Sequence, residues 1–342
     1  MEYRNLGLSG CAVSVFALGT MNFGDTTDDT GAFTQLDAFA AAGGTLLDTA
    51  DVYADGASET IIGRWLADRP TDITERMVLA TKGRFPTSTE PNGVGLSRRH
   101  LDRALDASLR RLGVDTIDLY QVHAWDPRTP IQETLSFLDD ATRSGKIRYA
   151  GLSNYLGWQI QKTMDTAERR GLTHPVTLQT GYSLLSREIE WEIVPACEST
   201  GLGMLTFSPL AAGILTGKYQ QDVTPPPNTR MAEHPMAAYL RRRSQHKRTL
   251  AVLDAAKTIA GNSGVTMAQV ALTWLAARPA VSSVILGART LDQLTANLPA
   301  GLQLSTEETA LLDEVSAPRV DFPYGGTVIH QMTRRIEGGW PM

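Results

Sequence analysis

The chain has 342 residues, of which 42% are hydrophobic and 20% are charged, a composition typical of a globular protein and not of a disordered or fibrous one. Its formal net charge of −5 gives no general attraction to nucleic acids or anionic membranes, so we expect neither as a partner. The two cysteines lack the spacing of a zinc or redox motif, and neither a signal segment nor an apolar run of about 18 residues occurs. We therefore expect no metal site, no membrane insertion and a cytoplasmic location.

Short apolar segments alternate along the chain with stretches of helical length, a pattern typical of buried parallel strands joined by helices. A glycine-punctuated opening predicts a β-hairpin, and the predicted strands that follow span 16–19, 45–48, 77–81, 117–122, 147–152, 176–179, 204–207 and 284–286. About eight parallel strands close a TIM barrel. We predict an α/β fold of the (β/α)8 type with an N-terminal hairpin, formed by one domain that spans residues 1–342.

Several segments between these strands carry the signals of helix N-termini, in which a hydroxyl side chain caps the helix and a Gln or Glu three residues later completes a capping box. The pairs are Thr129 with Gln132, Thr266 with Gln269, Thr290 with Gln293, and Ser305 with Glu308. Between Leu101 and Leu112, apolar residues recur at helical spacing with arginines on the other positions, which predicts an amphipathic helix.

The alternation is interrupted after the seventh strand, between Gly217 and about residue 244. This stretch contains Pro225, Pro226 and Pro227, so we predict a long loop that covers one mouth of the barrel; the alternative is a disordered surface excursion. The basic run 241–243 is interpreted as a solvent-exposed face.

In a parallel barrel, the side chains at the C-terminal ends of the strands meet at one mouth. Asp48 ends the second strand and Tyr53 follows it, Lys82 ends the third strand, and His123 ends the fourth. Each residue could also have a purely structural role. The aspartate or lysine could be a helix cap or a surface charge, the tyrosine a core residue with a hydrogen-bonded hydroxyl, and the histidine a structural residue. Their joint placement on three successive strand ends is what indicates a site.

These four side chains suit the reduction of a carbonyl group. Hydride addition builds negative charge on the carbonyl oxygen, which then needs a proton. Tyr53 can supply it as the general acid, Lys82 is expected to lower the pKa of that phenol, and Asp48 to hold the lysine charged. His123 can orient the carbonyl oxygen or share the proton. No G-x-G-x-x-G motif follows a strand, which disfavours a Rossmann dehydrogenase.

The segments 6–10, 18–24 and 48–53, the last followed by Ser58 and Glu59, resemble signatures of the aldo-keto reductase superfamily, and the resemblance covers essentially the whole chain. It implies a catalytic tetrad of Asp48, Tyr53, Lys82 and His123. It also implies NADPH as the cofactor and an aldehyde or ketone as the small-molecule substrate.

The resemblance further implies where the cofactor and the substrate bind. Ser153, Asn154 and Gln179 would hold the nicotinamide carboxamide, and Phe207 would stack on its ring. The full cofactor set is Gly19, Thr20, Met21, Ser153, Asn154, Gln179, Phe207, Ser208, Leu210, Gly213, Gly217, Lys218, Gly287, Arg289, Gln293 and Asn297. The substrate walls are expected from Met21, Asn22, Phe23 and Trp125.

Arg289 precedes a predicted helix start, and a guanidinium beside a helix N-terminus suits a phosphate monoester, which favours NADPH over NADH. The alternative is an exposed loop arginine. The branch that this chain most resembles includes potassium-channel β subunits and bacterial reductases. Its members often carry an acidic residue where Ala296 stands, so weaker adenine contacts are expected.

Two other functions are compatible with the sequence. Lys82 could act as the Schiff-base nucleophile of an aldolase, although this would leave the cofactor residues unexplained. Alternatively, the chain could be a non-catalytic or slow NADPH-sensing subunit. The sequence specifies neither the physiological substrate, nor the product stereochemistry, nor the strength of the preference for NADPH, and a homo-oligomer is compatible with it.

Overall fold

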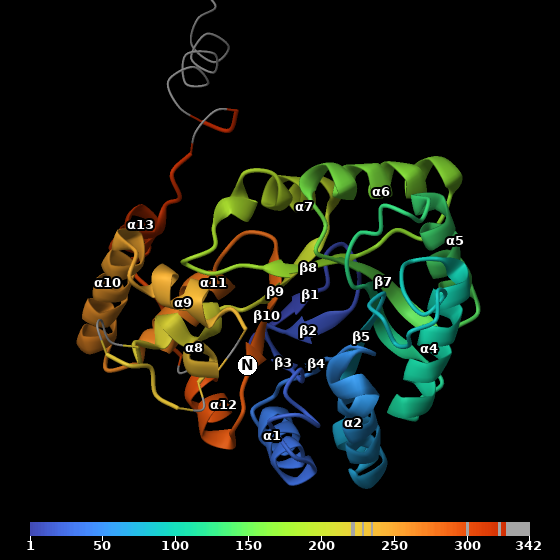
Figure 1. Ribbon diagram of the computed structural model, residues 1–342, viewed down its shortest axis with the longest axis horizontal. Helices are drawn as coiled ribbons and strands as arrows, with labels where there is room; N and C mark the ends of the chain where they lie inside the picture. Colours follow the sequence, from blue (N-terminus) through green and yellow to red (C-terminus); the bar gives the residue numbers. More distant parts are fainter. Residues whose placement is uncertain (220–222, 228, 234, 299–300, 321–322, 326–342) are drawn as a thin grey trace, which may run out of the picture.

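The computed structural model describes residues 1–219, 223–227, 229–233, 235–298, 301–320 and 323–325. Within these residues, a closed barrel of parallel strands is surrounded by helices, and a separate antiparallel hairpin precedes it (Figure 1). The barrel order is β10-β3-β4-β5-β6-β7-β8-β9, so every strand neighbours the next one along the chain and the last closes on the first. The predicted (β/α)8 barrel with its N-terminal hairpin is confirmed.

The barrel strands lie where the apolar segments predicted them. Their bounds are β3 Phe16–Gly19, β4 Leu46–Asp48, β5 Val78–Gly83, β6 Ile117–Val122, β7 Ile147–Ser153, β8 Thr177–Gly181, β9 Gly203–Phe207 and β10 Val281–Gly287. The largest difference is in β10, which begins at Val281 because Ser282 and Ser283 hide its start from an apolar pattern, although both serines are buried. Parallel strands covered on both faces are buried along their whole length, which explains why near-continuous apolar runs identified them.

The hairpin closes the N-terminal end of the barrel. Its strands are β1 Tyr3–Asn5 and β2 Ala12–Ser14. Leu6 and Val13 are fully buried and pack with residues from inside the barrel, among them Leu46 and Leu205. The guanidinium of Arg4 donates to the carbonyl oxygen of Val281 at 3.0 Å, which fixes the hairpin to the start of β10. The opposite, C-terminal mouth is left for the site.

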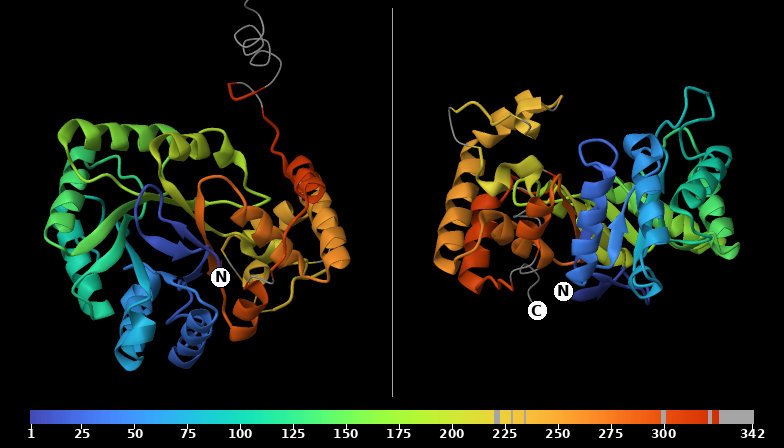
Figure 2. Two further views of the ribbon diagram at one scale, coloured as in Figure 1. Left: turned by 180° about the vertical axis from the view of Figure 1, so that it is seen from behind. Right: turned by 90° about the horizontal axis from the view of Figure 1, so that it is seen from below.

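Helices of the outer ring cover the barrel, as the two views in Figure 2 show. The α-helices are α1 Asp29–Ala41, α2 Ala57–Asp68, α3 Thr71–Thr74, α4 Arg98–Leu112, α5 Ile131–Arg143, α6 Gly157–Arg170, α7 Ile193–Thr200, α8 Arg230–Glu233, α9 Ala237–Ser244, α10 Lys247–Ser263, α11 Met267–Ala276, α12 Leu291–Asn297 and α13 Thr306–Ser316. Three short 3-10 helices, Tyr53–Gly56, Glu188–Glu190 and Ala211–Thr216, lie in loops after strands. None of the helices in the described part of the chain combines the length and hydrophobicity needed to cross a bilayer.

Two of the predicted capping boxes form completely, at the starts of α11 and α13. At α12, Thr290 caps the helix, but the amide oxygen of Gln293 accepts from the backbone of Arg289 instead of closing the box on Thr290. The box predicted at Thr129 is wrong. The Thr129 hydroxyl donates to the Asp126 carboxylate at 2.7 Å instead of capping the helix. Helix α5 begins at Ile131, after Pro130, and has no side-chain cap.

The segment predicted as a long loop is only partly irregular. It contains α8 and α9, while residues 220–222, 228 and 234 of the same stretch lie outside the described chain. Tertiary contacts hold α9: Arg241 donates to the carbonyl oxygen of Met231 at 3.3 Å, and Arg243 donates to the Ser186 hydroxyl at 2.6 Å. The interpretation of the basic run as a solvent-exposed face is therefore incomplete, because Arg243 is partly buried and binds the loop after β8.

Candidate active site

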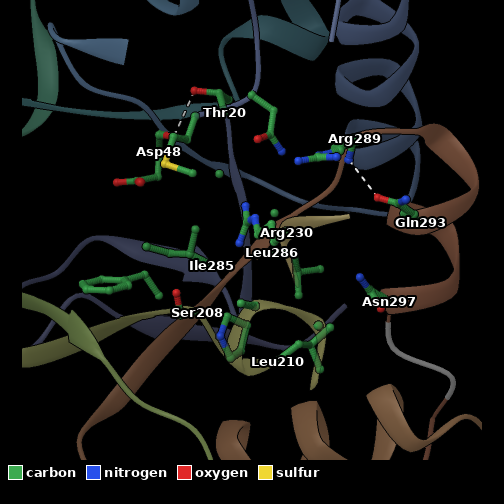
Figure 3. A pocket seen from close by; sticks show the side chains of 18 of the residues that line it. Thr20, Asp48, Ser208, Leu210, Arg230, Ile285, Leu286, Arg289, Gln293 and Asn297 are labelled. Atoms are coloured by element: carbon green, nitrogen blue, oxygen red, sulfur yellow. Dashed lines mark hydrogen bonds between the residues drawn. The ribbon is translucent and has the colours of Figure 1, made fainter. Parts of the chain in front are cut away.

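A cavity of about 740 Å³ opens at the C-terminal mouth of the barrel. Its walls come from the loops that follow the strands and from the segment that contains α8. Figure 3 shows that Asp48 and Thr20 lie at one end, and that Arg289, Gln293 and Asn297 lie at the other. Of the residues expected at the cofactor or the substrate, these line the cavity: Gly19, Thr20, Met21, Asn22, Asn154, Gln179, Phe207, Ser208, Leu210, Gly213, Lys218, Gly287, Arg289, Gln293 and Asn297.

Asp48 and Lys82 form a buried ion pair at the floor of the cavity. The Lys82 Nζ lies 2.8 Å from Asp48 Oδ2 and donates to the Thr49 carbonyl oxygen at 2.7 Å, and the lysine side chain is fully buried. Burial disfavours the charged amine, but the Asp48 carboxylate, together with the oxygen of Tyr53, outweighs it and raises the pKa of Lys82. The other carboxylate oxygen of Asp48, Oδ1, accepts a hydrogen bond from the Gln179 side-chain amide at 2.7 Å. The lysine is therefore held as a cation by a fixed carboxylate.

Tyr53 lies above this ion pair and lines the cavity. The Lys82 Nζ is 5.1 Å from the centre of the Tyr53 ring. Burial raises the pKa of Tyr53, and the charge and close approach of Lys82 lower it without cancelling the effect of burial. The expected influence of the lysine is present, but the net direction differs from the expectation because the phenol is more buried than its place in a loop suggested. Tyr53 consequently keeps its proton near neutral pH.

His123 lies beside Tyr53, with ring centres 6.0 Å apart and the planes nearly perpendicular. Burial and the nearby cations Lys82 and Arg84 lower the pKa of His123 to about 3. Its Nδ1 is buried and has no acceptor among the described residues, so the proton of the neutral ring is better placed on Nε2. A neutral imidazole can donate one hydrogen bond to a carbonyl oxygen, but it is a poor source of a proton at neutral pH.

The backbone around the cavity adopts conformations that ordinary residues avoid. Asn154 and Ser208 follow β7 and β9, line the cavity and have φ of 54° each. The Asn154 amide donates to the carbonyl oxygen of His123 at 3.0 Å, which ties the loop after β7 to the loop after β6. Non-glycine residues in this region cost of order 1–3 kcal/mol and cluster at functional sites. The strain is consistent with loops shaped for a ligand.

Two arginines meet at the far end of the cavity. Arg289 follows β10, and its backbone N–H donates to the Gln293 amide oxygen at 3.0 Å. Arg230 comes from α8 and also lines the cavity, and Figure 3 shows it between the Asp48 end and Arg289. Burial and the neighbouring Arg289 charge lower the pKa of Arg230. An anionic group bound between two cations in a cavity reduces the repulsion between them, so this pair of arginines favours an anion.

Five expected residues are not among the lining residues of the cavity: Lys82, which is buried beneath it, and four of those expected at the cofactor or the substrate. Phe23 is fully buried in the core, and Trp125 packs against Tyr155 with ring centres 5.3 Å apart. Ser153 is buried and its hydroxyl accepts from the Asn154 amide at 3.1 Å. Gly217 caps the 3-10 helix Ala211–Thr216 and is not a lining residue, although its neighbours Thr216 and Lys218 are. Phe23 and Trp125 follow strands in the chain, which predicted that they would line the cavity. Instead, both rings pack against hydrophobic neighbours.

Other lining residues were not assigned to the site from the sequence. They are Val52, Phe85, Pro209, Ala212, Thr216, Thr229, Arg230, Thr266, Ala268, Ile285, Leu286 and Ala296. Phe85 follows β5 and packs edge-on against His123 with ring centres 4.6 Å apart, so its position after a strand was a usable signal. Thr266 was recognised only as a helix cap, and Arg230 lies where the sequence has no regular pattern.

Comparison with known proteins agrees with this arrangement. The family model described as Aldo/keto reductase family matches residues 16–317. The chain is 37% identical to the uncharacterized oxidoreductase YrpG of Bacillus subtilis (strain 168), over 92% of this chain and 96% of that protein. It is also 37% identical to a probable voltage-gated potassium channel subunit beta of Oryza sativa subsp. japonica, over 88% of this chain and 91% of that protein. Versiconal hemiacetal acetate reductase of Aspergillus parasiticus is 32% identical over 94% of this chain and 99% of its own length. The chain therefore belongs to the aldo/keto reductase family of oxidoreductases.

Proposed function

We propose that this protein reduces the carbonyl group of an aldehyde or ketone with NADPH, and that Tyr53 is the general acid. The observation that carries the proposal is one continuous cavity with a phenol, a buried ion pair and a neutral imidazole at one end and two arginines at the other. The first end suits proton donation to a carbonyl oxygen, and the second suits a phosphate monoester.

The residues of the cavity fit a dinucleotide. Its volume of about 740 Å³ lies within the range of cofactor pockets. Asn154 and Phe207 would meet the nicotinamide, and Arg230 and Arg289 would meet the phosphate of the adenosine half. The helix that follows Arg289 has only seven residues, so the guanidinium groups carry this site more than the helix terminus does. NADPH, when bound, supplies the hydride for the carbonyl carbon.

The side chains of this protein would hold the proton and transfer it to the substrate. Tyr53 holds it on the phenol oxygen, and His123 donates a hydrogen bond from Nε2 that orients the substrate carbonyl. As negative charge grows on the carbonyl oxygen, the phenol proton moves to it, because the alkoxide is a stronger base than the phenolate. The Lys82 ammonium then stabilises the phenolate, and Asp48 keeps the ammonium in place.

A reactive aldehyde tests this proposal directly. When the protein loaded with NADPH is mixed with 4-nitrobenzaldehyde, we expect the absorbance of the reduced nicotinamide to fall within one turnover. The control omits the protein. An unchanged absorbance with fully loaded protein would contradict the reductase function.

A second candidate is a non-catalytic or slow NADPH-sensing subunit, because relatives named as potassium channel subunits beta resemble this chain. The mixing experiment distinguishes this candidate from the reductase by the rate at which the absorbance falls.

The aldolase alternative is disfavoured by the geometry. Lys82 is fully buried, paired with Asp48 and has a raised pKa, whereas an imine-forming lysine must be an accessible neutral amine.

The two arginines predict the choice of cofactor. Arg230→Ala and Arg289→Ala should each weaken NADPH binding by about 10- to 100-fold, because a charge-assisted contact to a dianionic phosphate is lost. Binding of NADH, which lacks that phosphate, should change by less than about threefold.

Fluorescence titration with both cofactors measures this difference. Arg242→Ala is the matched control, because Arg242 is exposed and lies outside the cavity lining. Equal losses for NADPH and NADH in the Arg289 variant would refute its phosphate role.

The substrate end of the cavity is largely apolar. Met21, Val52 and Phe85 line it beside Tyr53 and His123. We infer that the part of the substrate next to its carbonyl group is hydrophobic.

A further inference from the structure

Asp51 is a buried carboxyl group that the proposed proton transfer does not use. It lies on the loop between Asp48 and Tyr53 and is only 2% exposed, below the cavity and outside its lining. Its backbone N–H donates to the carbonyl oxygen of Lys82 at 3.1 Å, which places the residue directly against the strand of the lysine.

The carboxyl group of Asp51 has no hydrogen-bond partner among the described residues. Both of its oxygens are buried and make no hydrogen bond, although the backbone N–H of Val52 lies near enough to favour the charged form. A buried carboxylate is normally paired or hydrogen-bonded, because an isolated buried charge is costly. An unpartnered carboxyl in this position favours the protonated, neutral form.

The ionisable groups that act on Asp51 lie on α2, α4, β5 and β6 and on its own loop. Glu59 of α2 is fully buried and forms an ion pair with Arg111 of α4 at 2.7 Å. Lys82 of β5 and Tyr53 are its other ionisable neighbours near the proposed proton transfer. The hydroxyl of Tyr120 on β6 is also buried and unpartnered, and it occupies the space under Gly83, where an added Cβ would lie 2.2 Å from it.

These neighbours do not neutralise a charge on Asp51. Arg111 is already bound to Glu59, and Lys82 is bound to Asp48. Burial, followed by the negative charge of Glu59, raises the pKa of Asp51 to about 7, against the smaller opposing effects of Arg111, Val52 and Lys82. The negative charge of Asp51 in turn raises the pKa of Tyr53. The protonation state of Asp51 is thus coupled to the acidity of the phenol.

We propose that Asp51 is a positioning residue of the active site, whose buried and unpartnered carboxyl group must hold a proton for Tyr53 to act as an efficient acid. When Asp51 ionises, the added negative charge opposes the phenolate that forms on Tyr53, and the reduction slows. The inference rests on the proposed function, since it concerns the rate of the same proton transfer.

The sign of the pH dependence follows. Below about pH 7 Asp51 is neutral, and above it the carboxylate forms, so the rate should fall as the pH rises. Because the charge of Asp51 acts on Tyr53, which follows it on the same loop, its ionisation should change the single-turnover rate by about tenfold between about pH 6 and about pH 8.5. Asp51→Asn is permanently neutral, so its rate should stay near the fast acidic value over the same range.

A second variant keeps the carboxyl group of Asp51 but changes the pH at which it ionises. Glu59→Gln takes away the negative charge that raises the pKa of Asp51, so the fall in rate should occur at a lower pH. The matched control is Asp55→Asn, the same chemical change on the same loop. Asp55 is exposed and has φ of 53°, which asparagine tolerates, so its pH profile should match that of the wild type.

Infrared difference spectroscopy provides a measurement that needs neither cofactor nor substrate. The wild-type protein should show a protonated carboxyl band that disappears between about pH 6 and about pH 8.5, and Asp51→Asn should lack it. A missing band, or the same pH profile in Asp51→Asn as in the wild type, would overturn the role of Asp51. A wild-type protein that carries the band but never oxidises NADPH would contradict the proposed function instead.

Discussion

Replacing Tyr53 with phenylalanine should lower the single-turnover rate of carbonyl reduction by about 100- to 10,000-fold, the range that a positioned general acid contributes. The substitution removes only the hydroxyl, so the ring can keep its edge-on contact with His123. His123 cannot replace the lost acid, because its pKa of about 3 leaves it neutral at working pH. Binding of NADPH should change little, since the phosphate contacts lie at the other end of the cavity.

Tyr155→Phe is the matched control for this prediction. Its hydroxyl is also buried, it has no partner among the described residues, and it does not line the cavity. We expect reductase activity near that of the wild type. If Tyr53→Phe were as active as Tyr155→Phe, the assignment of the acid would be wrong.

Replacing Asp48 with alanine should reduce the free energy of unfolding by about 3–5 kcal/mol, because it leaves the buried Lys82 cation without its partner. The Gln179 amide would lose its acceptor at the same time, which adds to the loss. Without the carboxylate the lysine is also expected to deprotonate more easily, so it would stabilise the Tyr53 phenolate less and activity would fall.

Urea unfolding followed by circular dichroism measures the stability change. The comparison is Asp106→Ala, which breaks the ion pair of Asp106 with Lys146 at 2.7 Å. Both of those side chains are 45% exposed, so the loss should be at most about 1 kcal/mol. A similar small loss for Asp48→Ala would show that Lys82 is not held as a buried cation.

The barrel could be predicted because its strands are buried on both faces and appear as apolar runs between helical stretches. The helices α8 and α9 could not, because each is short and depends on distant partners. Arg243 of α9, for example, binds Ser186 in the loop after β8, and no local pattern encodes that contact. The same reasoning explains Thr129, whose hydroxyl is captured by Asp126 instead of capping α5.

The ionisable residues of the site could be proposed from their places at strand ends, because the barrel topology brings those ends to one mouth. The effect of burial could not be weighed in the same way. Sequence reasoning anticipated the influence of Lys82 on Tyr53 but not the larger, opposite influence of burial on the phenol. Arg230 reaches the cavity from α8, in a stretch whose sequence shows no regular pattern, so only the folded chain places it near Arg289.

Transfer of deuterium from labelled cofactor tests the central claim most directly. The protein would be given 4-nitrobenzaldehyde and NADPH deuterated at the transferred position of the nicotinamide, and the alcohol would be analysed by mass spectrometry. We predict an alcohol with one deuterium on the former carbonyl carbon, formed by the wild type and nearly absent with Tyr53→Phe. Unlabelled alcohol, or none from the fully loaded wild type, would contradict the proposal that this cavity reduces carbonyl compounds.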